Sequence, residues 1–163
     1  MSAEAATSEY RFEKRRTQAL VRLSSGEVAQ GCFFIAGGSA RHDGPERVWD
    51  LLNSESGFFP FELHGTPRPR TVLYNRAHVV TVSLADNEAS REPGYAVARR
   101  RLVTMVLSTG ARVTGTVRVY RPEGRDRVSD WSRQPELFRY IETDDLTLIV
   151  NTMHVVEVSE VPA

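Results

Sequence analysis

Cysteine is almost absent from this chain of 163 residues: Cys32 is the only one, so no internal disulfide can form. A secreted domain that depends on disulfides is therefore excluded. An excess of charge of one sign is also lacking, because 21 Lys and Arg residues balance 21 Asp and Glu residues. This balance argues against a uniformly basic surface, which is common in proteins that bind nucleic acid over most of their surface.

Long apolar runs are missing as well. No segment approaches the roughly 18 apolar residues that a membrane-spanning helix requires. Residues 1–8 lack the charged start and apolar core of a signal peptide. We therefore expect a soluble, cytoplasmic protein that makes no membrane contact.

What the chain does contain is an internal repeat. The matching segments, with their offsets, are 15–35 with 99–119 (84), 47–50 with 127–130 (80) and 75–82 with 151–158 (76). The offset changes only in two loop-like stretches rich in glycine, serine or proline, residues 36–45 and 64–70. A register that shifts only in loops indicates a duplicated structural unit.

The repeat predicts how the chain is divided. An N-terminal extension covers residues 1–14, and the first copy covers residues 15–84. A polar linker with Pro93 and Gly94, residues 85–94, precedes the second copy at residues 95–160.

Each copy shows the residue pattern of a half-buried sheet. Ala19, Val21 and Leu23 occupy one face of an expected strand, Val103, Met105 and Leu107 occupy the same face in the second copy, and turns containing glycine follow. Gly31 and Gly115 lie inside the second expected strand of each copy, which suggests a bend or a close backbone approach. The five short strands expected in the first copy are 19–23, 29–35, 58–63, 71–74 and 79–84. The sequence therefore predicts a mostly β protein of two tandem five-stranded small barrels, each with a short helix between strands two and three.

Two motifs carry a family resemblance. Residues 21–31 have the pattern Val-x-Leu-x-x-Gly-x-x-x-x-Gly, and residues 74–80 are Tyr-Asn-Arg-Ala-His-Val-Val. Together with the order of the strands, they resemble the Sm-like family of small barrels. The second motif is similar to the Tyr-Lys-His-Ala-Ile segment of the bacterial RNA-chaperone branch, with the histidine displaced by two positions. Residues 47–53, Arg-Val-x-Asp-x-Leu-Asn, resemble small uncharacterised bacterial domains.

The resemblance implies a binding role for the turn before the last strand. In the first copy it assigns ligand binding to Asn75, Arg76 and His78, and in the second copy, more weakly, to Asn151 and His154. A structural interpretation stays open, in which the asparagines stabilise the turns and the histidines bond to nearby backbone groups.

No enzyme signature accompanies these residues. The histidines have no metal-ligand spacing to Cys32 or to one another, and no phosphate loop or nucleophile elbow occurs. We expect no catalytic residue, no metal site and no cofactor.

Two functions then stay open. The first is a non-enzymatic binding or assembly module that associates with itself, or with a protein partner, through exposed edge strands. Because Sm-like proteins form rings, three chains would give a ring of six barrels. The second is RNA binding by the turn residues of the first copy.

Overall fold

The structure is a computed structural model that describes residues 14–37, 44–120, 124 and 126–162. Ten strands form one open antiparallel sheet in the order β10-β6-β7-β8-β9-β5-β1-β2-β3-β4. The mostly β class predicted from the sequence is confirmed. The strands are β1 (Lys14–Leu23), β2 (Val28–Ala36), β3 (Phe58–Leu63), β4 (Arg70–Asn75), β5 (Val79–Leu84), β6 (Arg99–Leu107), β7 (Arg112–Val119), β8 (Phe138–Glu142), β9 (Thr147–Asn151) and β10 (Val155–Glu160).

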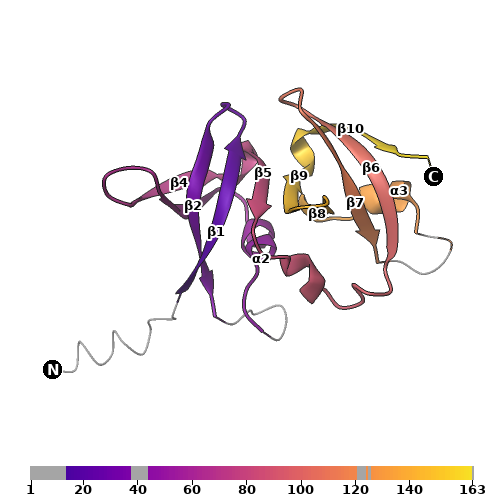
Figure 1. Ribbon diagram of the computed structural model, residues 1–163, viewed down its shortest axis with the longest axis horizontal. Coiled ribbons are helices and arrows are strands. Elements are labelled where there is room, and N and C mark those ends of the chain that lie inside the picture. The colour runs from indigo at the N-terminus through magenta and orange to yellow at the C-terminus, as the bar shows by residue number, and fades with distance from the viewer. Residues whose placement is uncertain (1–13, 38–43, 121–123, 125, 163) are drawn as a thin grey trace.

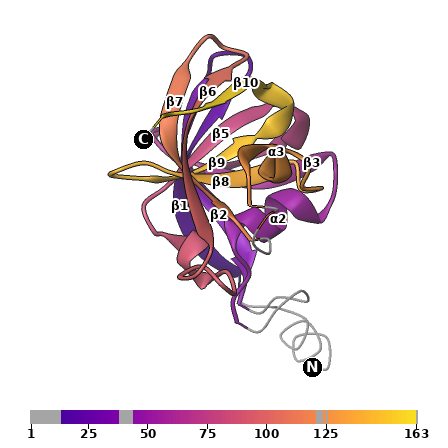
Figure 2. The ribbon, with the colours of Figure 1, turned by 90° about the vertical axis from the view of Figure 1, so that its right-hand side faces the viewer.

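The elements occur in the same order in both copies. Each copy has two strands, a short α-helix, two strands, a 3-10 helix and a last strand. Figure 1 shows the two groups of five strands side by side, and Figure 2 shows both α-helices on the same side of the molecule. The helices are α2 (Val48–Ser54), α3 (Val128–Ser132) and the 3-10 helices η1 (Arg76–His78), η2 (Glu88–Arg91) and η3 (Thr152–His154).

The prediction of two closed five-stranded barrels is wrong. Within each copy the strands lie in the order fifth, first, second, third, fourth, and the fourth strand does not pair with the fifth. β5 of the first copy pairs instead with β9 of the second, from Thr81 with Val150 to Leu84 with Thr147. We call this β5–β9 contact, with the turns that precede β5 and β10, the junction. An unpaired strand edge exposes backbone donors and acceptors, and the junction satisfies them across the two copies.

Both copies depend on a glycine where the second and third strands cross closely. A Cβ atom added at Gly31 would overlap the backbone oxygen of Glu62, and one at Gly115 would lie 2.6 Å from the backbone oxygen of Glu142. The close backbone approach predicted at these glycines is confirmed, because only a residue without Cβ fits there.

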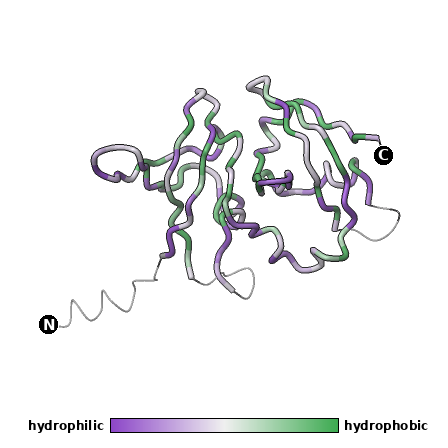
Figure 3. Tube along the Cα trace, viewed as in Figure 1, coloured by the Kyte–Doolittle hydropathy of each residue, from purple (hydrophilic) through white to green (hydrophobic). Residues whose placement is uncertain are grey.

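The two apolar cores interlock at the junction. Phe138 and Ile149 of the second copy are buried in the core of the first, and Val80 of the first copy is buried in the core of the second. Along β6 and β7, buried positions alternate with less buried ones, and Figure 3 shows apolar segments in both groups of strands. In the described part of the chain, no helix has the length and apolar character needed to span a membrane.

Candidate functional site

The two asparagines predicted as ligand-binding residues begin the 3-10 turns. The side-chain oxygen of Asn75 accepts a hydrogen bond from the backbone N–H of Ala77 at 3.0 Å, and that of Asn151 accepts one from Met153 at 3.0 Å. These bonds are the local Asx turns that asparagine favours. One side-chain group of each asparagine therefore stabilises its own turn.

The two histidines hold these turns against the first hairpin of each copy. His78 Nδ1 lies 2.9 Å from Ser24 Oγ, and His154 Nδ1 lies 2.8 Å from Ser108 Oγ. The backbone N–H groups of the same serines donate to the backbone oxygens of the same histidines, at 2.8 and 2.7 Å. The duplicated sequence thus produces the same local contact twice.

Arg76 is a buried residue and not a free surface cation. Its guanidinium donates to the backbone oxygen of Phe58 at 2.8 Å and to that of Leu51 at 3.0 Å. Burial lowers the pKa of Arg76 from its usual value, while the carboxylate of Glu55 acts in the opposite direction. Arg76 Nε is buried without a hydrogen-bond partner among the described residues. The arginine therefore connects the end of α2 to the start of β3.

At the junction, the second turn binds the first. Asn151 Nδ2 donates to the backbone oxygens of Arg76 and Val79, at 3.2 and 2.9 Å, and Asn151 is 1% exposed. His154 Nε2 lies 2.7 Å from the backbone oxygen of Ala77. A carbonyl oxygen can only accept, so Nε2 carries a proton. The second-copy residues that the sequence indicated are thus the ones that recognise the first copy.

The linker between the two copies also connects them. The carboxylate of Glu88, in η2, accepts hydrogen bonds from the backbone N–H groups of Val48 and Trp49 at 2.9 and 3.0 Å. It also accepts the hydroxyl of Tyr140 from β8 at 2.6 Å. Burial, with the negative charge of Glu88 beside it, raises the pKa of Tyr140 well above its usual value. One buried carboxylate therefore connects α2 of the first copy to β8 of the second.

β10 and β4, which match β5 and β9 in the repeat, each have a neighbouring strand on one side only. No strand in the described residues pairs with the outer edge of β4 or of β10, and we call these the open edges. Leu73 on β4 is 65% exposed, whereas Ile149, at the matching position of β9, is buried. Val156 on β10 is 71% exposed, whereas Val80, at the matching position of β5, is buried. Apolar side chains that the junction covers in one copy are uncovered in the other.

The turn that follows β4 also presents two side-chain nitrogens without a partner. Asn75 Nδ2 and His78 Nε2 have no hydrogen-bond partner among the described residues. In Asn151 and His154, the same two atoms bind the neighbouring turn. The first copy therefore has the side-chain nitrogens that bind at the junction, but in a single chain they have no partner.

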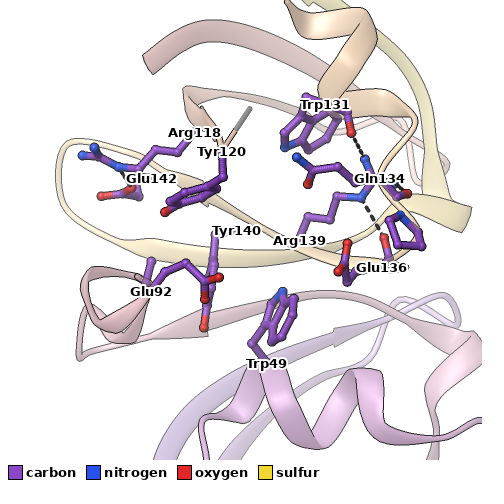
Figure 4. Close-up of a pocket in the computed structure, with 12 residues that line it drawn as sticks. Trp49, Glu92, Arg118, Tyr120, Trp131, Gln134, Glu136, Arg139, Tyr140 and Glu142 are labelled. Atoms are coloured by element: carbon purple, nitrogen blue, oxygen red, sulfur yellow. Dashed lines mark hydrogen bonds and ion pairs between the residues drawn. The ribbon is translucent and has the colours of Figure 1, made fainter. Parts of the chain in front are cut away.

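A cavity of about 220 Å³ lies between α2 of the first copy and α3 and β8 of the second (Figure 4). Trp49 of α2 stacks on Tyr140 of β8 at its edge, with ring centroids 6.1 Å apart. Arg118 forms an ion pair of 2.8 Å with Glu142, and Arg139 donates to the backbone oxygens of Trp131 and Gln134. These charged lining groups are engaged by the protein itself.

A larger groove, of about 490 Å³, lies at the turns themselves. Arg76 and Asn151 line it together with apolar residues that include Phe138 and Met153. Of the predicted site residues, the structure therefore brings these two to one surface. His78 and His154 do not line the groove.

One group of potential metal ligands was missed by the sequence analysis. Cys32 of β2 lies opposite Glu62 of β3, and His64 follows that strand. One ligand atom from each residue lies within 4.8 Å of the other two. Burial raises the pKa of the Cys32 thiol, and the negative charge of Glu62 raises it further. The spacing of these residues in the sequence does not indicate the group, because Cys32 reaches the other two residues only through the pairing of β2 with β3.

No known protein family, curated protein or solved structure matches this chain. The resemblance to Sm-like proteins therefore stays a prediction.

Proposed function

We propose that this protein is a non-enzymatic assembly module whose chains join head to tail through their open edges. The outer edge of β10 in one chain pairs with the outer edge of β4 in the next. One observation carries the proposal: the chain makes the same type of contact internally, between β5 and β9. Because β10 matches β5 and β4 matches β9 in the repeat, each chain has one free edge of each kind.

The junction predicts the register of the contact between chains. The offset of 76 converts each junction pair into a pair between a β10 residue and a β4 residue. The expected pairs are Glu157 with Tyr74, Val158 with Leu73, Ser159 with Val72, and Glu160 with Thr71. Pairing in this register covers Leu73 and lines up the backbone donors and acceptors of both edges.

The unused donors of the first copy fit the same contact. By analogy with Asn151, Asn75 Nδ2 donates to the backbone oxygens of Thr152 and Val155 in the neighbouring chain. By analogy with His154, His78 Nε2 donates to the backbone oxygen of Met153. The predicted ligand of these turn residues is thus the turn of another copy of the chain.

Contacts of this kind join two different surfaces, so they close into a ring when the rotation per chain permits and otherwise continue as a filament. A ring of three chains, with six copies of the duplicated unit, is the form that the Sm-like resemblance suggests. The assembled sheet then has no open edge left.

The test uses one charged substitution at each open edge. Leu73→Lys places a charge on β4 and Val156→Lys places one on β10, and both positions are exposed within a single chain. Light scattering of the unaltered chain should give a mass above that of one chain, and each variant should give a smaller assembly. Val97→Lys is the matched control, because Val97 is an 87% exposed apolar residue outside both edges. It should leave the mass unchanged.

Mixing the two edge variants distinguishes head-to-tail assembly from a symmetric dimer. The Leu73→Lys chain keeps its β10 edge and the Val156→Lys chain keeps its β4 edge, so the mixture should form a one-to-one dimer and nothing larger. A strictly monomeric unaltered chain overturns the proposal. So does an assembly that neither edge variant reduces.

The groove at the turns is the one observation that favours RNA binding, the second candidate function, because Arg76 and Asn151 line it. It is the weaker candidate, since the guanidinium of Arg76 is already bound to backbone oxygens. Fluorescence anisotropy with a short single-stranded RNA tests it. Binding that weakens steeply as salt rises supports contact between arginines and phosphates. An absence of binding at low salt eliminates RNA as the ligand.

A further inference from the structure

The proposed assembly does not explain why Cys32, Glu62 and His64 lie together. We propose that these three side chains bind a Zn²⁺ ion on the face of the first-copy sheet that points away from its core. Cys32 lies on that face because its neighbour Phe33 points into the core, and side chains alternate along a strand.

The ligand atoms converge. His64 Nε2 lies 3.0 Å from Glu62 Oε1. The Cys32 sulfur lies within 4.8 Å of one imidazole nitrogen of His64 and of one carboxylate oxygen of Glu62. Ligand atoms around a tetrahedral zinc ion are separated by roughly 3.5 Å, so the separation of each pair of ligand atoms needs to change by little more than an ångström at most. Arg16 contacts the other carboxylate oxygen, Glu62 Oε2, at 3.3 Å, so Oε1 faces the ligand group.

The second copy shows what the same strand pair looks like without these ligands. Glu142 occupies the place of the first-copy glutamate, but it is neutralised by an ion pair of 2.8 Å with Arg118. In the first copy Phe34 stands at the position of that arginine, and Cys32 stands at the position of Thr116. In the first copy, β2 therefore has no arginine beside the glutamate, whose arginine contact is the exposed Arg16 of β1, and it places a thiol there.

The chemistry of the set favours zinc. A thiolate, an imidazole and a carboxylate oxygen are the side-chain ligands that Zn²⁺ commonly takes in proteins. Three protein ligands leave a fourth position for water, and the His64 side chain is partly exposed, at 36%. Binding would cross-link β2 to β3 next to the open edge of β4. It involves none of the junction residues, so the zinc proposal stands apart from the assembly proposal.

The experiment titrates the metal-free full chain with Co²⁺, which reports its ligands by absorption. We expect a thiolate-to-cobalt charge-transfer band together with the visible bands of a tetrahedral ion, both removed by Zn²⁺. Cys32 is the only cysteine, so a charge-transfer band can come from no other residue of the chain. Cys32→Ser should abolish that band.

Substitutions of the other two ligands test the proposal even if Cys32→Ser fails to fold. His64→Gln and Glu62→Gln should each weaken cobalt binding by about tenfold or more, since even residues that only support ligands cost 10–100-fold. Glu27→Gln, at the exposed first hairpin turn, is the matched control and should bind like the unaltered chain. Absence of the band in the unaltered chain overturns the proposal. Equal binding by the His64 and Glu62 variants and the control shows cobalt on the thiol alone and also overturns it.

Discussion

The fourth and fifth strands of the two copies match in sequence but differ in their surroundings. β9 is buried at every position, and β5 at every position except Ser83. β4 and β10, their counterparts, have no buried position. The residue patterns are similar, so the difference comes from the second neighbouring strand, which β5 and β9 have and β4 and β10 lack. The burial of a strand at the edge of one copy therefore depends on whether a strand of the other copy pairs with it.

The duplicated turns show the same contrast in hydrogen bonding. Asn75 and Asn151 make the same local bond, but only Asn151 reaches a second turn. Identical residues therefore contribute differently to stability. Substitutions at matched positions of the two copies measure this difference.

The largest effect is expected at the glycines of the second strands. Gly31→Ala should reduce the free energy of unfolding by about 4 kcal/mol, because the added methyl group overlaps the backbone oxygen of Glu62. Gly115→Ala should cost about 2 kcal/mol, since the matching contact to Glu142 is 2.6 Å. Urea unfolding of both variants checks the order. Equal losses would show that the two copies bend alike.

After Gly31, the next largest effect is expected at Asn151, one of the two asparagines of the turns. Asn151→Ala should cost about 3 kcal/mol, because it leaves two buried backbone oxygens and one N–H without their partner. Asn75→Ala should cost about 1 kcal/mol in a dilute, unassembled chain, since one local bond is lost. Chemical unfolding at low protein concentration separates these values. At high concentration, Asn75→Ala should also reduce the mass found by light scattering, whereas a variant with unchanged mass argues against Asn75 at the contact between chains.

An effect between those of the two asparagine substitutions is expected at the hydroxyl that joins the linker to β8. Tyr140→Phe should reduce stability by about 1.5 kcal/mol at neutral pH, because the bond to the Glu88 carboxylate is lost. The folded protein holds the pKa of Tyr140 above the unfolded value of about 10, so this stability is fully present below pH 10. It is lost as the pH rises further, because only the unfolded chain then ionises. Thermal unfolding between pH 7 and 11 should show the two proteins converging above pH 10, and parallel curves would contradict the assignment.

Much of the candidate site could be predicted from the sequence because it is duplicated. The offset of 76 marked Asn75, His78, Asn151 and His154, and all four are engaged at the turns. The role of Arg76 could not be predicted, since its burial depends on α2 and β3 packing around it. The Cys32 group was equally hidden, because the register of β2 against β3 brings it together.

The sequence by itself determined the strands, the hairpin turns, the two glycine crossings and the repeat. These follow from local alternation and from the steric demands of individual residues, which are the same wherever the strand lies. Only the tertiary structure decided that the copies stay open and share one sheet. The pairing of β5 with β9 joins segments that are distant in the sequence. It is made by backbone hydrogen bonds, which do not depend on the identity of the side chains, so no residue pattern predicts it.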